Sequence, residues 1–471
     1  MNEVKTTTRS KTTIIKDALK LCKKHDYTCS IFAPTGKVVS KIRDDLETYD
    51  RAILDKICSV STMHKFLVAI DNDKKQNITH EYYMENSETH SDSDQKNNKN
   101  NKYNKYNNDT FDLLAFIFTV KLIIIDEVSM LSNTLFKRFL DAIQYIKVNT
   151  NIVLLGDPNQ LPSIECGNIL SNLLKVDSIP KTTLIQPMRF NPKSGLFNTI
   201  NQIKNCEIPH NSGGFEFIKV SVGSDYEKIV MDTVKKTMKH YDFSEIMVIT
   251  PTRANIEKYG ESIRKMVHKI NKISYSEKLC IGDYIILTKN VYTYQQKKYV
   301  DKNGRYLISS KKDLFNGMIG QITDIVTREN NHDYFVVKFG TIGNDGNDNR
   351  IEAHFDIEFF NQKQINSLSY INTVHKYQGS ENKIAIFILT DKDKFFPDNK
   401  LLYTAISRAK EKCILISDED SFNIAIKKQI ERKSCLESFI NGCFDECKPI
   451  KQTKKIVKKS NNKNNNQLKS I

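Results

Sequence analysis

The sequence predicts an α/β protein of two or more domains, with a small β-rich insert in its second half. Short apolar runs, which are typical of buried parallel strands, alternate with helix-like segments. These runs are Thr28–Ala33, Leu122–Asp126, Ile152–Gly156, Ile246–Thr250 and Ile384–Leu389. Between Asp283 and Phe360 the apolar runs lie closer together, with Gly, Asn and Asp turns between them, which indicates a β-barrel-like insert. The length of 471 residues also exceeds what one hydrophobic core usually serves.

The composition indicates a soluble protein that binds phosphates. Hydrophobic residues make up 39% of the chain and charged residues 27%, which excludes a wholly disordered protein. The formal net charge of +15 suits a partner rich in phosphate, such as nucleic acid. Part of that charge lies in residues 448–471, which hold eight Lys and no acid and are expected to form a disordered basic tail.

The ten cysteines are scattered, so we expect reduced thiols in an intracellular compartment, either the nucleus or the cytoplasm. Cys435, Cys443 and Cys447 come closest to a cluster. They lack a paired C-x-x-C and a nearby His, so buried thiols are a better interpretation than a zinc site. The sequence contains no apolar run of membrane-spanning length and no signal-peptide core, so we expect no membrane partner.

Residues 71–110 are polar and low in complexity, and Lys96 to Asn108 contain only Lys, Asn and Tyr. Such a segment cannot bury enough apolar surface to offset its ordering entropy. We therefore expect a flexible insertion at 71–110.

The strongest local signal is an apolar strand, Leu122–Ile125, that ends in two adjacent acids, Asp126 and Glu127. At the carboxyl end of a parallel strand, one carboxylate can hold Mg²⁺ while the next orients and deprotonates a water molecule. The alternative is a strand that runs into a solvated acidic turn.

The next predicted strand is followed by Gly156-Asp-Pro-Asn-Gln-Leu-Pro162. Gly156 and Pro158 favour a turn at the strand end, which would direct the Gln160 amide toward the edge that carries the acids. This pattern is more specific than an ordinary β-turn.

Together, these residues resemble motifs II and III of superfamily 1 helicases, particularly the RecD/Dda-like enzymes. Further segments resemble the other motifs of the family in the expected order. They are Ala33–Lys37 (motif Ia), Ser61–Leu67 (the following DNA-contact motif), Gln186–Arg189 (motif IV), Asn372–Glu381 (motif V) and Leu401–Lys410 (motif VI). The resemblance covers the chain from about residue 10 to residue 415.

The resemblance implies two RecA-like P-loop NTPase domains with parallel sheets. Phe315–Gly320 resembles the Asn-Gly turn that opens a small SH3-like β-barrel insert in the second domain of these helicases. The expected boundaries are 1–190 for domain 1, with the insertion at 71–110; 191–283 and 361–447 for domain 2; and 284–360 for the insert. Relatives carry a strand-separating pin where the insertion falls, and its low complexity puts such a pin in doubt.

The resemblance implies ATP and Mg²⁺ as cofactors. Lys11 is expected to contact the β- and γ-phosphates, Thr12 and Asp126 to hold Mg²⁺, and Glu127 to act as the base. Gln378 and Glu381 are expected among the nucleotide-binding residues, with Glu381 near the ribose.

Three further side chains are expected to sense and stabilise the γ-phosphate, namely Gln160, Arg189 and Arg408. Guanidinium groups are suited to neutralising the charge of a transferred phosphoryl group, and Arg408 matches the arginine finger of the family. Either arginine alone could equally be a surface or ion-paired residue.

The resemblance also implies a track for single-stranded DNA, lined by Thr35, His64, Thr373 and His375. Hydroxyl and imidazole groups can bind phosphate oxygens without reading the base sequence. Each of these residues alone could equally be a helix cap or a core residue. The implied activity is that of an ATP-dependent DNA helicase or translocase in replication, repair or recombination, a monomeric motor moving 5′ to 3′, with RNA as an open alternative.

The phosphate-binding loop departs from the family pattern. A P-loop has the form G-x-x-x-x-G-K-[ST], because its glycines let backbone N–H groups wrap the phosphates. This chain keeps Lys11 and Thr12 but has Lys5 and Ser10 at the glycine positions, and only Met1–Val4 precede them. Non-glycine residues cost strain wherever the loop requires a positive φ.

Two explanations of this loop compete. Either the chain lacks its proper N-terminal start, or it is a degenerate relative that binds single-stranded nucleic acid without hydrolysis. We favour the first, because the other expected catalytic residues are all retained. These are Asp126, Glu127, Gln160, Arg189, Gln378 and Arg408.

Overall fold

The computed structural model describes most of the chain. The described residues are 5–7, 10–47, 57–76, 116–147, 149–184, 195–221, 223–292, 307–328, 332–340, 348, 350–361, 365–432 and 436. The predicted basic tail (448–471), most of the predicted insertion (71–110) and Cys435, Cys443 and Cys447 lie outside them. All seven cysteines in the described ranges are free thiols. Among the described residues, no helix combines the length and apolar composition needed to span a membrane.

The first domain is built on a four-stranded parallel sheet of order β3-β2-β4-β5. Its strands are β2 (Cys29–Ala33), β3 (Cys58–Thr62), β4 (Leu122–Ile125) and β5 (Asn151–Leu154). Its helices are α1 (Lys11–Lys24), α2 (Gly36–Glu47), α4 (Met63–Gln76), α7 (Asn133–Ile146) and α8 (Ile169–Leu174). Alternate residues of β4 face two separate cores, Ile123 and Ile125 on one side and Ile124 on the other, so the strand is apolar throughout.

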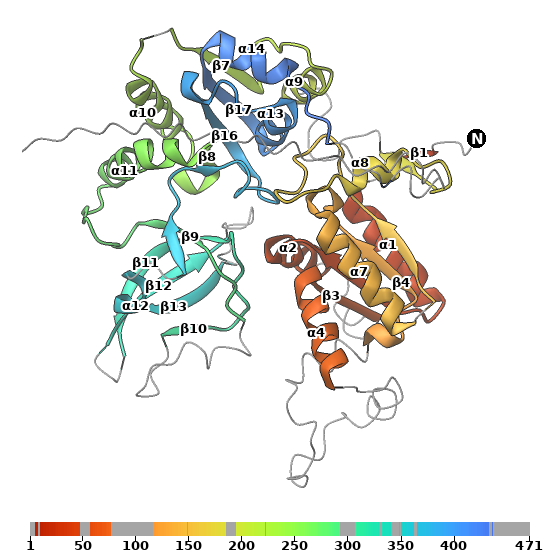
Figure 1. The fold of residues 1–471 in the computed structure, drawn as a ribbon. Helices are drawn as coiled ribbons and strands as arrows, with labels where there is room; N and C mark the ends of the chain where they lie inside the picture. The colour runs from red at the N-terminus through yellow and green to blue at the C-terminus, as the bar shows by residue number, and fades with distance from the viewer. Residues whose placement is uncertain are drawn as a thin grey trace, which may run out of the picture.

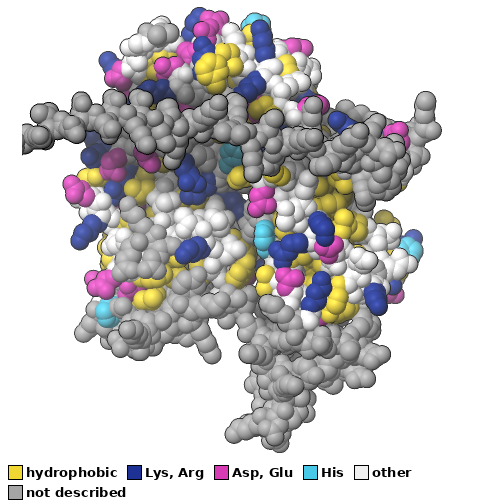
Figure 2. All heavy atoms as spheres, in the orientation of Figure 1, with side chains coloured by type: hydrophobic (Ala, Val, Ile, Leu, Met, Phe, Trp, Pro, Cys, Tyr) yellow, Lys and Arg dark blue, Asp and Glu magenta, His cyan; other side chains and the backbone are white. Residues whose placement is uncertain are grey.

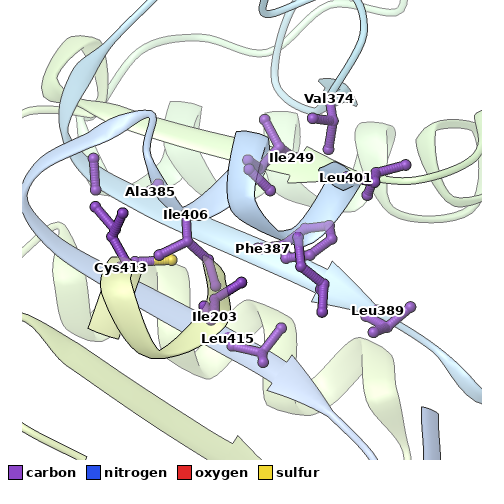
Figure 3. Packing of buried hydrophobic residues seen from close by; sticks show 14 of the residues in the cluster. Ile203, Ile249, Val374, Ala385, Phe387, Leu389, Leu401, Ile406, Cys413 and Leu415 are labelled. Atoms are coloured by element: carbon purple, nitrogen blue, oxygen red, sulfur yellow. The ribbon is translucent and has the colours of Figure 1, made fainter. Parts of the chain in front are cut away.

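The second domain contains a five-stranded parallel sheet of order β15-β8-β16-β17-β7. Its strands are β7 (Phe215–Lys219), β8 (Ile246–Thr250), β15 (Asn372–Thr373), β16 (Asn382–Leu389) and β17 (Ala409–Ser417). Its helices are α9 (Gly195–Lys204), α10 (Tyr226–Thr237), α11 (Arg253–Ile270), α13 (Asn399–Ile406) and α14 (Glu419–Lys427). Ala385, Phe387 and Leu389 of β16 pack into the core shown in Figure 3, while the residues between them face the opposite core. The α/β fold with two RecA-like domains is therefore confirmed.

The insert is a six-stranded antiparallel sheet of order β10-β13-β12-β11-β9-β14 that lies beside both domains (Figure 1). Its elements are β9 (Tyr284–Leu287), β10 (Ile308–Ser310), β11 (Ile319–Thr327), β12 (Asp333–Phe339), β13 (Ile351–Asp356), α12 (Ile357–Asn361) and β14 (Asn366–Leu368). The sheet thus extends past residue 360 to Leu368. A β-rich insert is present, and its SH3-like form and the domain boundaries stay predictions.

A buried polar cluster joins the insert to α11. Arg264 donates to both oxygens of Asp283 at 2.7 Å, and Tyr370 and His268 contact the Asp283 Oδ1 atom at 2.9 and 3.0 Å. Each of Arg264, His268 and Asp283 is 1% exposed or less. Because a buried carboxylate requires such partners, this cluster fixes the backbone where β9 begins.

The structure corrects three details of the expected strands and loops. Lys5 is not part of a loop: it begins β1 (Lys5–Thr7), which pairs in parallel with β6 (Thr182–Leu184). Residues 71–76 belong to α4 rather than to a flexible insertion. Ile152 and Val153 were expected in a buried strand, yet they are 39% and 36% exposed, because among the described strands β5 lies at the edge of its sheet and pairs with β4 alone.

The insert also contacts the first domain at the start of α2. A Cβ atom added to Gly36 would overlap the ring of Phe315 from the insert, so the ring and the backbone are in close contact. Next to it, Lys37 donates to the carbonyl oxygen of Gly317 at 3.2 Å and to the Ser380 hydroxyl of domain 2. The insert and both RecA-like domains therefore meet at Gly36 and Lys37.

Replacing Gly36 with Ala should force the Phe315 ring to move and destabilise the protein by about 1–3 kcal/mol. The melting temperature followed by circular dichroism should fall, and Phe315→Ala in the same chain should recover part of the loss. Gly213→Ala is the matched control, since nothing lies within 4 Å of its added Cβ. Equal melting temperatures for the Gly36 and Gly213 variants would contradict this contact.

Candidate functional site

Lys11, Asp126 and Glu127 meet at the carboxyl edge of the first sheet. β4 ends at Ile125, so the next two residues place their carboxylates at this edge, and α1 begins there with Lys11. The Lys11 Nζ atom lies 2.7 Å from the Oε1 atom of Glu127 and 3.5 Å from the Oδ1 atom of Asp126. One cation thus balances two adjacent carboxylates.

Burial determines the electrostatics of this cluster. Asp126 is 8% exposed, and desolvation raises the pKa of its carboxyl group, while Lys11 lowers it and Glu127 raises it further. Glu127 has a left-handed backbone, with φ 52° and ψ 44°, and its N–H donates to Asp126 Oδ1 at 2.8 Å. A non-glycine residue in this region is strained, and such strain is common at functional sites.

Ser10, at the position before α1 where a glycine was expected, has an ordinary backbone conformation. Ser10 has φ −81° and ψ 161°, an extended conformation that costs no strain. Its hydroxyl oxygen accepts a hydrogen bond from the Thr13 N–H at 3.0 Å and so caps the helix. Ser10 therefore supports the helix that carries Lys11 and Thr12, but it also occupies one of the N–H groups at the helix start.

The turn after β5 lies beside the acid pair. The Val128 N–H donates to the carbonyl of Leu155 at 3.0 Å, and a Cβ on Gly156 would lie 2.7 Å from Leu170. Gly156 is therefore required by close packing rather than by a positive φ. Asp157 Oδ1 accepts from the Asn159 N–H at 2.9 Å, which tightens the turn that positions the partly buried Gln160.

The same turn is bonded to the second domain. The Leu161 N–H donates to the Thr404 hydroxyl at 2.9 Å, and the Gln378 amide donates to the Leu161 carbonyl at 3.4 Å. The Tyr403 hydroxyl donates to Asp157 at 2.8 Å. Motif III in the first domain is thus connected directly to motifs V and VI in the second.

Two residues that were expected near the nucleotide, Glu381 and Arg408, have other partners in the structure. Glu381 forms ion pairs with Lys41 at 2.9 Å and Lys410 at 3.2 Å. Arg408 is 2% exposed and donates to the carbonyl oxygens of Thr404 and Ser380 at 3.0 and 3.2 Å. No contact among those described places either residue next to Lys11. Arg189 lies outside the described residues.

The four expected nucleic-acid contacts lie at strand ends. Thr35 and His64 follow β2 and β3, which are neighbours in the first sheet, and His64 is exposed. Thr373 ends β15, and its hydroxyl accepts from the Lys376 N–H at 3.3 Å, while the Thr35 hydroxyl accepts from the Val38 N–H at 3.4 Å. Both threonines thus cap a turn. Burial lowers the pKa of His375, an effect that Asp398 opposes and Arg432 reinforces.

The structure adds residues that the sequence reasoning missed. Burial, together with the nearby charges of Lys41 and Arg408, lowers the pKa of Lys37 to about 8. In the second domain, Asp393 accepts hydrogen bonds from Thr252 at 2.8 Å and Asn255 at 2.7 Å at the end of β8. The sequence did contain a signal for Thr252, because β2 and β8 are both followed by Pro-Thr, at Pro34-Thr35 and Pro251-Thr252.

Comparison with known families gives two matches. A family model described as an AAA domain matches residues 9–210, and one described as a UvrD-like helicase C-terminal domain matches residues 368–416. The first contains Lys11, Asp126 and Glu127, and the second contains His375, Gln378 and Arg408.

Several curated proteins are similar along much of the chain. The RecBCD enzyme subunit RecD of Haemophilus influenzae is 21% identical over 480 residues, covering 92% of this chain and 68% of that protein. The ATP-dependent RecD2 DNA helicase of Deinococcus radiodurans is 22% identical, covering 66% and 38%. An uncharacterised protein of Methanocaldococcus jannaschii is 23% identical, covering 88% and 36%. This chain therefore spans little more than a third of the last two relatives.

Solved structures of Pif1 helicases are also similar. A Bacteroides Pif1 helicase in complex with ADP-AlF3 and ssDNA is 15% identical, with a TM-score of 0.44, over 94% of this chain and 98% of that one. The Pif1 helicase of Candida albicans is 13% identical, with a TM-score of 0.43, over 92% and 99%.

Replacing Lys37 with Met should change how stability depends on pH. The pKa of Lys37 is about 8 in the folded chain against a usual 10.5, so raising the pH from 8 to 10.5 removes a partly buried charge from the folded state first. The free energy of unfolding of the unmodified chain should therefore rise relative to that of Lys37→Met across this range. Urea unfolding followed by circular dichroism at pH 7.5 and 9.5 measures the difference. Exposed Lys175→Met is the control, and a pH-independent difference for Lys37→Met would contradict the assignment.

Proposed function

We propose that this chain is a member of the RecD-like branch of superfamily 1 helicases and an ATP-hydrolysing motor acting on single-stranded DNA, which its similarity to an AAA domain, a UvrD-like helicase C-terminal domain and RecD proteins supports. The observation that carries the proposal is the position of Lys11 between Asp126 and Glu127 at the carboxyl edge of the first sheet. Parallel α/β sheets bind ligands at this edge. The name of the RecD2 relative, an ATP-dependent DNA helicase, supports both the nucleotide and the nucleic acid.

The residues at this edge fit a magnesium–nucleotide complex. A buried carboxylate and a helical hydroxyl are hard oxygen ligands, so Asp126 and Thr12 would hold Mg²⁺, which would neutralise phosphate charge. Lys11 would contact the β- and γ-phosphates. A triphosphate competes for the Lys11 ammonium and draws it away from Glu127.

Glu127 then acts as the base. Once Lys11 binds phosphate, the Glu127 carboxylate would be able to orient a water molecule and accept its proton as the water oxygen bonds to the γ-phosphorus and ADP leaves. Gln160, on the adjacent turn, would sense the γ-phosphate. Arg408 would stabilise the transferred charge after turning from the carbonyl oxygens that it binds here, and Arg189 would assist it.

Movement along DNA would follow because the expected DNA contacts are divided between the two domains. Thr35 and His64 lie on the first domain, and Thr373 and His375 on the second. Closing the domains on nucleotide would change the spacing between the two pairs along a bound strand. The hydrogen bonds from Leu161 and Gln378 link the catalytic turn to that motion. We propose 5′-to-3′ travel by a monomer, in repair, recombination or replication.

A second candidate is a protein that binds single-stranded nucleic acid without turnover. The loop before α1 favours it, because Ser10 replaces a glycine and its hydroxyl occupies the Thr13 N–H that a P-loop would offer to phosphate. The two candidates differ in one property, hydrolysis.

Hydrolysis of ATP by the full chain, measured with and without single-stranded DNA, separates the candidates. The motor predicts turnover that rises with DNA and falls at least about 100-fold in Glu127→Gln, the range expected for losing a general base. Glu165→Gln, an exposed acid on a nearby loop, is the matched control and should keep full turnover. DNA binding without turnover would instead support the second candidate, and equal turnover in both variants would rule out Glu127 as the base.

A further inference from the structure

Two adjacent phenylalanines are unusually exposed on the second domain. Phe395 is 75% exposed and Phe396 is 54% exposed, in the loop between β16 and α13. Single exposed apolar side chains are common, but two neighbouring aromatic rings facing solvent mark an interaction site more often than a structural one. Neither ring belongs to the helicase motifs recognised in the sequence.

The backbone beneath these rings is held firmly. Asp393 is 3% exposed and accepts hydrogen bonds from Thr252, Asn255 and Thr390 at 2.7–2.8 Å. On the other side, Lys428 at the end of α14 donates to the carbonyl oxygen of Phe395. The rings are therefore presented on a fixed support, so little conformational entropy is lost when they bind a partner.

The loop lies at the same edge as the expected DNA contacts. β15, β8 and β16 are adjacent parallel strands, so their carboxyl ends form one edge, which carries Thr373, Thr252 and the loop in turn. Asp398, two residues after Phe396, is close enough to His375 to raise its pKa against the effect of burial. The two rings therefore extend the edge on which Thr373 and His375 lie.

The surroundings of the rings are rich in lysine. Lys392 is exposed, and Lys394 forms an ion pair with Asp420 at 3.5 Å. Lys428 donates to the carbonyl oxygen of Phe395. A surface hollow of about 530 Å³ lies beside the loop and is lined by Lys394, Lys427 and Lys428 together with Asp420, Asn423 and Ile424. Figure 2 shows basic, acidic and hydrophobic side chains next to one another over α14, at the top of the molecule. Aromatic rings next to cations match the bases and phosphates of a single strand.

We propose that Phe395 and Phe396 form a stacking platform for bases of single-stranded DNA at the carboxyl edge of the second sheet. This assignment rests on the proposed function. The rings supply sequence-independent stacking, while Lys392, Lys394 and Lys427 neutralise the phosphates next to the stacked bases. The platform lengthens the contact of the second domain with the strand beyond Thr373 and His375.

Changes at the two rings should weaken DNA binding through stacking rather than charge. In the full chain, Phe395→Ala with Phe396→Ala should lower affinity for oligo-dT about tenfold or more, since each ring would stack on a base. The slope of affinity against salt concentration should not change, because the lysines remain. Leu at both positions should not restore binding, and Ile164→Ala, at a residue 80% exposed in the first domain, is the control.

Base stacking can be measured directly by tryptophan fluorescence, because the chain contains no Trp of its own. Phe396→Trp introduces a single indole whose fluorescence should be quenched when oligo-dT stacks on it. Unchanged affinity in the double Ala variant, or full rescue by Leu, would overturn the platform while leaving DNA binding by the unmodified chain intact. No DNA binding by the unmodified chain would overturn both the platform and the proposed function. Indole quenching by an added protein but not by DNA would assign the rings to a protein partner instead and overturn the platform.

Discussion

Asp126 and Glu127 place two carboxylates side by side at the end of a buried strand, and the first domain depends on the cation that balances them. Lys11 provides that cation at 2.7 and 3.5 Å, which fixes where α1 must begin. Ser10 completes the arrangement by capping the helix in an unstrained conformation. In the proposed function the same ion pair would connect folding to chemistry, because a bound triphosphate would compete for Lys11 and so change the charge around Glu127.

The second domain is bonded to the turn after β5, which lies beside this cluster. Asp157 and Leu161 of that turn bond to Tyr403, Thr404 and Gln378. The Asp283 cluster on α11 and the contact of Phe315 with Gly36 both hold the insert. The two domains and the insert therefore contact one another at residues of the expected helicase motifs. A change at the carboxyl edge of the first sheet can thus alter the spacing of the expected DNA contacts.

Much of the fold could be predicted from sequence because parallel strands buried on both faces leave a plain signal. The runs that became β2, β4, β8 and β16 were found with small errors at their ends, and the acid pair was correctly placed at a strand end. Long-range contacts left no such signal. Gly36 is explained only by Phe315, a residue of the insert, and the pairing of Glu381 with Lys41 depends on how two domains pack. The conformation of Ser10 could not be predicted from the sequence either. Its side chain caps α1 while its backbone stays extended, so this position needs no positive φ.

The proposed function requires that Lys11, Thr12 and Asp126 bind a magnesium–triphosphate complex although the loop lacks its glycines. Equilibrium binding of a fluorescent ATP analogue to the full chain, with and without Mg²⁺, tests it most directly. We expect saturable, Mg²⁺-dependent binding that unlabelled ATP displaces and that Lys11→Ala abolishes. Binding that is absent, or that is equal in the unmodified chain and in Lys11→Ala, would contradict it.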